Sequence, residues 1–217
     1  YNDIYEVKLP ENHRFPMEKY RKVRELVQQG ISSLEEGRVL CEFRVSPLST
    51  ESVLMLAHSK EYIERYIAGD ISEEEARNVG FPWSLEGVKR TTSSVGGTVA
   101  AAVAVCEEWE RRRAKDGAAS ALLCWGAHVA GGTHHAFYDR GEGFCVFNDI
   151  AVAANVALRR FPDSIRRILI LDLDVHQGDG NAAIFADHPE VFVLSIHGEK
   201  NFPFRKVPST LDVGLPD

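Results

Sequence analysis

The chain has 217 residues, of which 44% are hydrophobic, and its formal net charge is −7. This composition excludes a disordered, collagen-like or mucin-like chain and predicts one sizeable core. The excess of 32 Asp and Glu over 25 Lys and Arg argues against direct contact with nucleic acid, which usually binds a basic face.

Helical periodicity predicts four helices in the first part of the chain. The four segments are 18–29, 53–57, 62–67 and about 94–113. Thr50 is expected to cap the second helix, and Gly30 and Gly69 are expected to end the first and the third. The segment 70–84 is acidic and then punctuated by Gly and Pro, which predicts a surface loop.

Strands alternate with helices in the second part. Apolar strands are expected at 121–129, 165–175 and 191–196, and the intervening helices after Asn148 and over 181–186. Nearly continuous apolar strands separated by helices indicate a mostly parallel sheet covered on both faces. The sequence therefore predicts a single α/β domain over 1–217 with three α/β/α layers. Its last residues, 214–217, are expected to form a loop.

Cysteine usage and hydropathy indicate the compartment. Cys41, Cys106, Cys124 and Cys145 are widely spaced and form no C-x-x-C pair, so reduced thiols are expected. No apolar run approaches the roughly 18 residues of a membrane span, and the N-terminus lacks a signal-peptide pattern. We therefore expect an intracellular protein with no membrane partner, in the cytoplasm, the nucleus or an organelle stroma.

The most informative segment follows the apolar run 168–171. On a continuing strand Asp172, Asp174 and His176 would share one face, because side chains alternate across a strand. Two carboxylates close together on a buried strand repel each other and are costly to desolvate, and a bound cation removes that cost. Carboxylate and imidazole groups are ligands for a catalytic divalent metal. The alternative is a buried ion-pair network without metal.

A second cluster is the Gly131-Gly132-Thr133-His134-His135 segment. Neighbouring imidazoles can serve as general base and general acid near neutral pH when carboxylates fix their tautomers. Asp172 and Asp179 are the candidate carboxylates. Two other interpretations remain open: both histidines could bind metal, or one could lie in the core and the other at the surface.

These motifs resemble the central motifs of histone deacetylases and their bacterial relatives, and the class IV and bacterial-type branch in particular. The matching segments are 131–136, 143–149 and 172–180, together with 13–17 and 195–197. The resemblance extends over essentially the whole chain in the order of the family. It implies the arginase/deacetylase-like fold and hydrolysis of the acetyl amide of N-acetyl-lysine, on histone or non-histone protein, with one catalytic Zn²⁺.

The resemblance also implies residue roles. Asp174 and His176 would ligate the zinc ion, while His134 and His135 would be the tandem acid/base pair, supported by Asp172 and Asp179. A structural monovalent cation such as K⁺ would be bound by the Ser195 hydroxyl and by backbone oxygens of four residues: Asp172, Asp174, His176 and Ile196. Gly143, Phe144 and Phe202 would line the channel for the acyl-lysine side chain, where aromatic rings pack on a methylene stem.

Two parts of the family pattern are absent from this sequence. The third metal ligand, an Asp, and the oxyanion-binding Tyr have no counterpart after Asp179, since Asp187, Asp212 and Asp217 do not match the family's third-ligand motif. A catalytic zinc site usually has three protein ligands. We therefore expect a domain incomplete at its C-terminus with an open sheet edge, which alone binds zinc weakly and deacetylates poorly or not at all. Its partners would be the missing C-terminal segment and an acetylated lysine or small acylated amine.

Two competing functions remain open from the sequence. A ureohydrolase such as arginase would share the fold but would bind two manganese ions. A pseudoenzyme would retain the pocket as an acyl-lysine-binding or partner-binding module without turnover. Among the remaining residues, His58, His128 and His188 are expected to be packing or surface histidines and Cys145 a buried thiol. Trp83 could contact substrate or pin its own loop.

Overall fold

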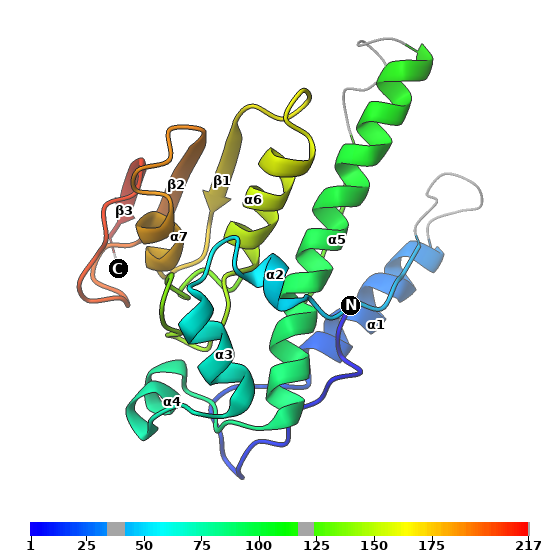
Figure 1. Ribbon diagram of the computed structural model, residues 1–217. Helices are drawn as coiled ribbons and strands as arrows, with labels where there is room; N and C mark the ends of the chain where they lie inside the picture. Colours follow the sequence, from blue (N-terminus) through cyan, green and yellow to red (C-terminus); the bar gives the residue numbers. More distant parts are fainter. Residues whose placement is uncertain (34–41, 117–123, 217) are drawn as a thin grey trace.

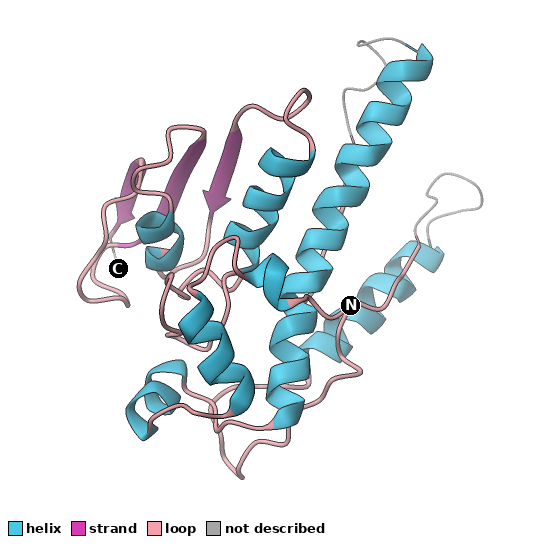
Figure 2. Ribbon diagram, in the orientation of Figure 1, coloured by secondary structure: helices cyan, strands magenta, loops and turns pink. Residues whose placement is uncertain are grey.

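The computed structural model describes residues 1–33, 42–116 and 124–216 (Figure 1). Helices predominate, and the three strands come late in the chain (Figure 2). The helices are α1 (Lys19–Ser33), α2 (Glu51–Leu54), α3 (Lys60–Ala68), α4 (Glu73–Val79), α5 (Leu85–Asp116), α6 (Asp149–Arg160) and α7 (Asp179–Ile184). The strands are β1 (Ile168–Asp172), β2 (Val191–Gly198) and β3 (Leu211–Leu215).

The strands form one parallel sheet in the order β1-β2-β3. Ile168 of β1 pairs with Val191 of β2, and Leu194 of β2 pairs with Leu211 of β3, so the carboxyl ends of the strands lie at one edge of the sheet. The α/β class and the parallel arrangement are confirmed. In open sheets of this kind, ligands bind beyond the carboxyl ends of the strands.

One face of the sheet is covered by helices. Ile170 and Val193 are buried in a core that also holds Val152 of α6 and Phe185 at the end of α7. The long helix α5 packs along α6 on the far side of this layer (Figure 1). The core therefore extends from this face of the sheet across α6 to the helices α2, α3 and α5.

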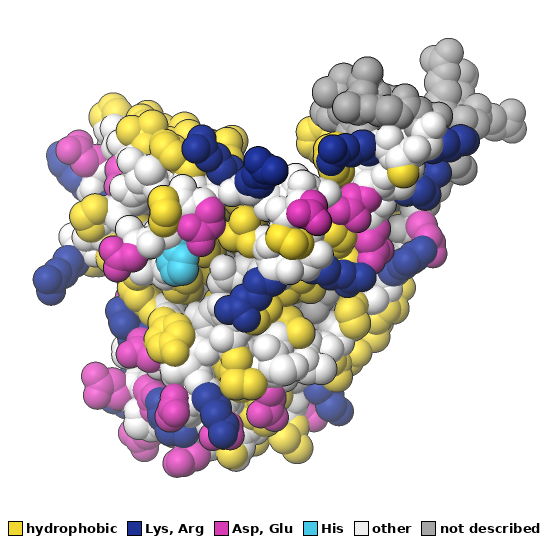
Figure 3. Space-filling view, turned by 45° about the horizontal axis from the view of Figure 1, so that its top comes forward, with side chains coloured by type: hydrophobic (Ala, Val, Ile, Leu, Met, Phe, Trp, Pro, Cys, Tyr) yellow, Lys and Arg dark blue, Asp and Glu magenta, His cyan; other side chains and the backbone are white. Residues whose placement is uncertain are grey.

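The opposite face of the sheet is apolar and exposed. Leu169, Leu171 and Phe192 have exposed fractions of 61%, 52% and 43%. Hydrophobic side chains gather on the surface over the part of the molecule that holds the sheet (Figure 3). The expected second helical layer is therefore not contributed by the residues that the structure describes. The residues of β3 are all exposed, which matches the expected open edge.

The predicted boundaries at Gly69 and Asn148 are confirmed, whereas the Ser59 cap was not predicted. Ser59 caps α3 by accepting from the Tyr62 amide, and Gly69 ends this helix in the left-handed conformation. Asn148 caps α6 by accepting from the Ala151 amide. Thr50 occupies the expected cap position of α2 without a side-chain capping bond. The short helix expected over 181–186 is α7, shifted towards the N-terminus.

Other predictions about the elements are wrong. The segment 70–84 contains α4, because Ser72 and Glu75 form a capping box that starts a helix. The α5 helix begins at Leu85, and α1 continues past Gly30 to Ser33. Residues 124–129 of the expected strand 121–129 have no strand structure, and 121–123 lie outside the described residues.

The C-terminal part also differs from the prediction. The loop expected over 214–217 overlaps the end of β3, which spans Leu211–Leu215. The strand expected over 165–175 is shortened to Ile168–Asp172. Throughout the described ranges, no helix has the length and apolarity needed to cross a membrane. Cys106, Cys124 and Cys145 are free thiols, as predicted, while Cys41 is outside the described ranges.

Candidate active site

The candidate site lies where β1 ends and α7 begins. Asp172 is the last residue of β1 and Asp179 the first residue of α7, while His134 and His135 belong to a loop before α6. The expectation that Asp172, Asp174 and His176 share one strand face is wrong, because β1 ends at Asp172. The chain turns instead: the Asp174 amide donates to Asp172 Oδ1 at 3.1 Å, and the His176 amide donates to Asp174 Oδ1 at 2.8 Å. The turn still leaves Asp174 and His176 in contact.

The first histidine of the tandem pair is bonded to the strand. His134 Nδ1 lies 2.6 Å from Asp172 Oδ2, and both side chains are buried. Burial lowers the pKa of His134, but the hydrogen bond to Asp172 and the charges of Asp172, Asp174 and Asp179 outweigh it, so the pKa is raised. The protonated form of His134 is thereby favoured.

The second histidine is bonded to α7. His135 Nδ1 lies 2.7 Å from Asp179 Oδ1, with exposed fractions of 4% and 2% for the two residues. The two imidazole rings lie beside each other with centroids 4.0 Å apart. Each Nδ1 is thus occupied by a carboxylate, which leaves each Nε2 available for chemistry. The expected pairing of His134 with Asp172 and of His135 with Asp179 is present.

Asp174 and His176 form the part of the site open to solvent. His176 Nδ1 lies 2.8 Å from Asp174 Oδ1, and the side chains are 40% and 50% exposed. Burial raises the pKa of Asp174, but hydrogen bonds from His176 and the nearby imidazoles lower it more, so the carboxylate is the favoured form. The His176 ring lies 5.9 Å from that of His135, between centroids. A carboxylate and an imidazole are ligand types that a catalytic zinc site uses, and this pair lies beside the tandem histidines.

Asp174 and His176 are the two candidate metal ligands that the structure brings together. In the described parts of the chain, no group of three or more His, Cys, Asp or Glu side chains could hold a metal ion. Asp187 is exposed, and Asp212 accepts hydrogen bonds from Gln177 and the Ser209 amide. Asp217 lies outside the described residues. The donors therefore fit a metal site to which a further ligand must be added.

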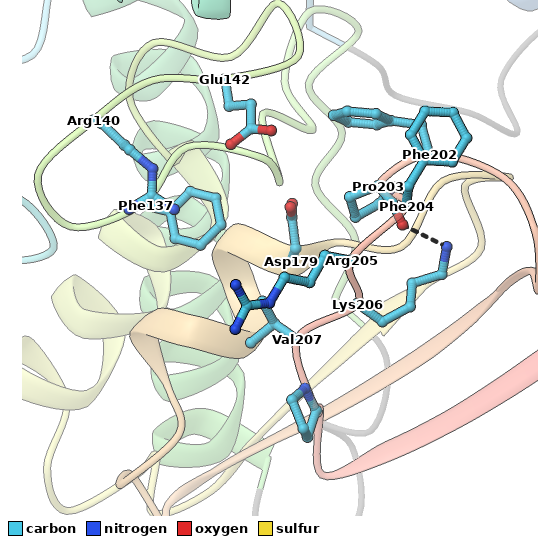
Figure 4. Close-up of a pocket in the computed structure, with 11 residues that line it drawn as sticks. Phe137, Arg140, Glu142, Asp179, Phe202, Pro203, Phe204, Arg205, Lys206 and Val207 are labelled. Carbon is cyan, nitrogen blue, oxygen red and sulfur yellow. Dashed lines mark hydrogen bonds between the residues drawn. The ribbon is translucent and has the colours of Figure 1, made fainter.

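An aromatic wall and a cavity adjoin the histidines. The Phe202 ring lies 5.1 Å from His135 and 6.0 Å from His176, between centroids. On the side of Asp179, a cavity of about 620 Å³ opens between two loops (Figure 4). Glu142 and Arg140 come from one loop, and the segment 202–208 forms the other wall. Asp179 and Phe202, which both contact His135, line this cavity, while the tandem histidines themselves are not among its lining residues.

The residues expected to line the channel have different surroundings. A Cβ on Gly143 would lie 2.8 Å from His135 Cδ2, and Gly143 adopts a φ of 57°, so this residue packs directly against the site. The Phe144 ring contacts Phe15 and Phe81, each at 5.1 Å between centroids. The structure thus brings Gly143 and Phe202 to His135 and places Phe144 in a neighbouring aromatic cluster.

The expected monovalent-cation residues lie on neighbouring elements. Ser195 of β2 pairs in register with Asp172, and Ile196 pairs with Val213 of β3. The Ser195 side chain is fully buried, and its hydroxyl lies 2.9 Å from His197 Nδ1. This hydroxyl therefore already has a protein partner.

His58, His128 and His188 are packing or surface histidines, as expected. His58 and His128 are held by hydrogen bonds, and burial lowers the pKa of each to about 4. His188 is exposed beside Glu190. Burial raises the pKa of the Cys145 thiol to about 12, which makes it a poor nucleophile. Trp83 donates to the Tyr66 carbonyl at 2.7 Å, which favours its role in pinning the loop.

Sequence reasoning missed three buried residues that support the site. Asn148 was assigned only as a helix cap, and Asp149 and Gln177 received no role. Asp149 accepts hydrogen bonds from the Gly132 and Thr133 amides, and Gln177 exchanges two hydrogen bonds with the backbone of Val207. Their signal in the sequence is a polar residue within an apolar or glycine-rich motif, where burial requires partners.

A glycine in α7 is required by the loop of the tandem histidines. A Cβ on Gly180 would lie 2.4 Å from the Ala136 carbonyl oxygen and 2.6 Å from that of His134. We expect Gly180→Ala to lower the free energy of unfolding by about 1–3 kcal/mol, because backbone must move. The matched control is Gly30→Ala, whose Cβ meets nothing within 4 Å inside α1, and which should be neutral or stabilising. Urea unfolding measures both, and equal effects would contradict the contact.

Comparisons with known proteins agree on one family. The model of the histone deacetylase domain matches residues 13–214. An uncharacterised protein of Picosynechococcus sp. is 41% identical over 218 residues, covering 100% of this chain and 65% of that protein. The acetoin utilization protein AcuC of Bacillus subtilis is 32% identical over 183 residues, covering 80% of this chain and 42% of AcuC.

Solved structures that resemble this chain also include histone deacetylase homologues. A histone deacetylase homologue from Aquifex aeolicus matches with a TM-score of 0.67 at 25% identity, covering 100% of this chain and 57% of that chain. A histone deacetylase homologue complexed with SAHA has a TM-score of 0.67 at 26% identity and covers 99% of this chain and 57% of that chain. The chain thus spans between 42% and 65% of the length of these relatives.

The fold and the site together define an arginase/deacetylase-like α/β protein, with paired histidines and carboxylates at the carboxyl end of a parallel sheet. The family model covers nearly all of the sequence, and the expected motifs lie in the matched range. The chain belongs to the histone deacetylase family.

Proposed function

We propose that the intact protein is a metal-dependent amidohydrolase that removes the acyl group from N-acyl-lysine, in a protein or peptide, or from a small acylated amine. The observation that carries the proposal is the juxtaposition of two buried histidine–carboxylate pairs with the solvent-open pair Asp174 and His176. Amide hydrolysis needs a base for water and an acid for the leaving amine, and adjacent imidazoles supply both. Membership of the deacetylase family supports the same reaction.

Each residue has a distinct task in this proposal. Asp174 and His176 would hold Zn²⁺ together with a further ligand, and the bound ion would supply Lewis acidity towards the amide carbonyl and water. His135, which is the tandem histidine in ring contact with His176, would accept the proton of the attacking water at Nε2. Asp179 keeps the Nδ1 proton of His135 in place, so that Nε2 is the basic nitrogen.

His134 would serve the second half of the reaction. Its raised pKa favours a charged imidazolium, which stabilises negative charge on the substrate and can give a proton to the leaving nitrogen. Phe202 would exclude water beside the acyl-lysine stem, and Gly143 and Phe144 are proposed to line the rest of the channel. We further propose that a monovalent cation such as K⁺ binds beneath β1 and β2, through backbone oxygens near Ser195.

A second candidate function is supported by the small number of metal ligands. With two ligands among the described residues, the chain could bind acylated substrates without hydrolysing them. Such a pseudoenzyme would retain the aromatic wall at Phe202 and the histidine pairs. Its predicted behaviour is saturable binding of an acyl-lysine peptide with no release of amine.

The test is a panel of acyl-lysine peptides and acetylated polyamines incubated with the intact protein. We expect release of free amine, loss of release after zinc chelation, and recovery when zinc is added back. Elemental analysis should give one zinc per chain, whereas two manganese ions would indicate a ureohydrolase. Turnover that survives both chelation and the His135→Ala substitution would refute the mechanism, and binding without turnover would favour the pseudoenzyme.

A further inference from the structure

Both flanks of the tandem histidines are held by two consecutive residues at the start of α6. Asn148 is the N-cap of this helix and Asp149 its first residue, and both have exposed fractions of 0%. His134 and His135 belong to the loop that precedes them, and their own Nδ1 atoms are directed to Asp172 and Asp179. The position of that loop therefore decides whether both carboxylate contacts can form together.

Asp149 holds the upstream flank. Its carboxylate accepts from the Gly132 amide at 3.1 and 3.0 Å, from the Thr133 amide at 2.7 Å, and from the hydroxyl of Thr98 on α5. Amides, hydroxyls and the N-terminus of α6 stabilise its charge. A buried carboxylate that takes its donors from the loop fixes the backbone immediately before His134.

Thr133 makes this contact reciprocal. Its hydroxyl oxygen accepts from the Asp149 amide at 3.0 Å, while its own amide donates to Asp149 Oδ1. The hydroxyl proton has two acceptors within 2.6 Å, the Phe147 carbonyl and Asp149 Oδ1. The pattern is that of a capping box, but it joins a helix to a loop remote in sequence.

Asn148 holds the downstream flank. Its side-chain amide donates to the Ala136 carbonyl at 3.1 Å and to Asn181 Oδ1 at 2.9 Å. The backbone N–H of Asn181 in turn donates to the His134 carbonyl at 3.2 Å. The peptide that carries the two imidazoles is thereby fixed at both ends to α6 and along its length to α7.

We propose that Thr133 and Asp149 are positioning residues, which lock the tandem histidines in register with Asp172 and Asp179. The catalytic consequence rests on the proposed function, but the structural consequence does not. Neither residue touches a reacting atom. Misplacement of a catalytic group by about 1 Å costs on the order of 100-fold in rate, so loss of the reciprocal bond should be visible in kcat.

The test compares Thr133→Val, which keeps the shape and removes the hydroxyl, with Thr133→Ser, which keeps the hydroxyl. In the intact protein we expect Thr133→Val to lower kcat about 100-fold with little change in KM, and Thr133→Ser to retain most of the activity. Thr133→Ala serves as a second variant should valine prevent folding. Asn155→Ala removes a hydrogen bond to the Leu56 carbonyl away from the loop and is the matched control for lowered stability.

A second readout does not depend on turnover. The buried Nδ1 protons of His134 and His135 should give downfield imidazole proton signals in ¹⁵N-edited NMR spectra. We expect these signals to broaden or disappear in Thr133→Val and to persist in Thr133→Ser and Asn155→Ala. Unchanged signals and kcat in Thr133→Val would overturn the positioning role. If the wild-type protein shows the signals but hydrolyses none of the acylated amines, the proposed function fails while this comparison still decides the inference.

Discussion

Replacing His135 with alanine is expected to lower kcat/KM of the intact protein by about 1000-fold, which lies within the range for loss of a general acid or base. The imidazole is 4% exposed, its Nδ1 is engaged by Asp179, and its ring lies beside both His176 and Phe202. No other described side chain occupies this position, so the water would lose its proton acceptor. Steady-state kinetics on an acetyl-lysine peptide measures the effect.

The controls separate chemistry from folding. His188→Ala removes an exposed histidine next to Glu190 and should leave kcat/KM unchanged. Asp179→Asn keeps the shape of the partner and should cost less than His135→Ala, because the imidazole remains in place with a weakened orientation. If His135→Ala retains more than a tenth of the wild-type activity while folded, another group must be the base.

The sequence identified the side-chain pairs of the site more closely than the backbone that carries them. The pairs His134 with Asp172 and His135 with Asp179 followed from the motifs, and both contacts are present. The shared strand face was wrong, because the chain turns immediately after Asp172. Alternation along a strand applies only while the strand continues, and the position of its end depends on partners that no local pattern encodes.

Some helices were predicted from the sequence and others were missed. Helix α3 was predicted with its terminal glycine, because Gly69 acts locally, while its cap Ser59 was not predicted. Helix α4 was missed although the Ser72-x-x-Glu75 spacing of a capping box was visible, since the acidic composition and nearby Gly and Pro favoured a loop. Local capping chemistry outweighed composition.

The burial of the two sheet faces could not be predicted from the sequence. Leu169 and Leu171 are as apolar as Ile170, so the pattern predicted burial on both faces. In the described chain Ile170 is buried and its two neighbours are more than half exposed. Hydrophobicity indicates which residues can be buried, but it does not indicate which of them another element covers. The contacts of Asn148 and Asp149 with the histidine loop were equally hidden, because their partners in that loop lie 12 to 17 positions upstream.

The second large effect is expected at His58, a histidine that bridges two loops. Its Nδ1 lies 2.8 Å from the Phe137 carbonyl, and its Nε2 accepts from the Asn148 amide at 2.8 Å. The residue is 1% exposed, and it thus ties the α2–α3 turn to the segments on both sides of the site. We expect His58→Gln to lower the free energy of unfolding at pH 7 by about 2 kcal/mol, since at least one buried polar group loses its partner.

The same residue should make the protein sensitive to acid. Burial lowers the pKa of His58 from 6.5 to about 4, because a proton on Nε2 would face the Asn148 amide proton and the charge would be poorly solvated. The unfolded state therefore binds a proton first as the pH falls. Stability from this group is complete above pH 6.5, declines between 6.5 and 4, and amounts to about 3 kcal/mol.

Urea unfolding at pH 7 and pH 4.5 should show that the difference in the free energy of unfolding between wild type and His58→Gln becomes smaller in acid. His128 shifts in the same direction and is present in both proteins, so it cancels in the comparison. A difference that stays constant between the two pH values would mean that His58 is not held neutral by the fold.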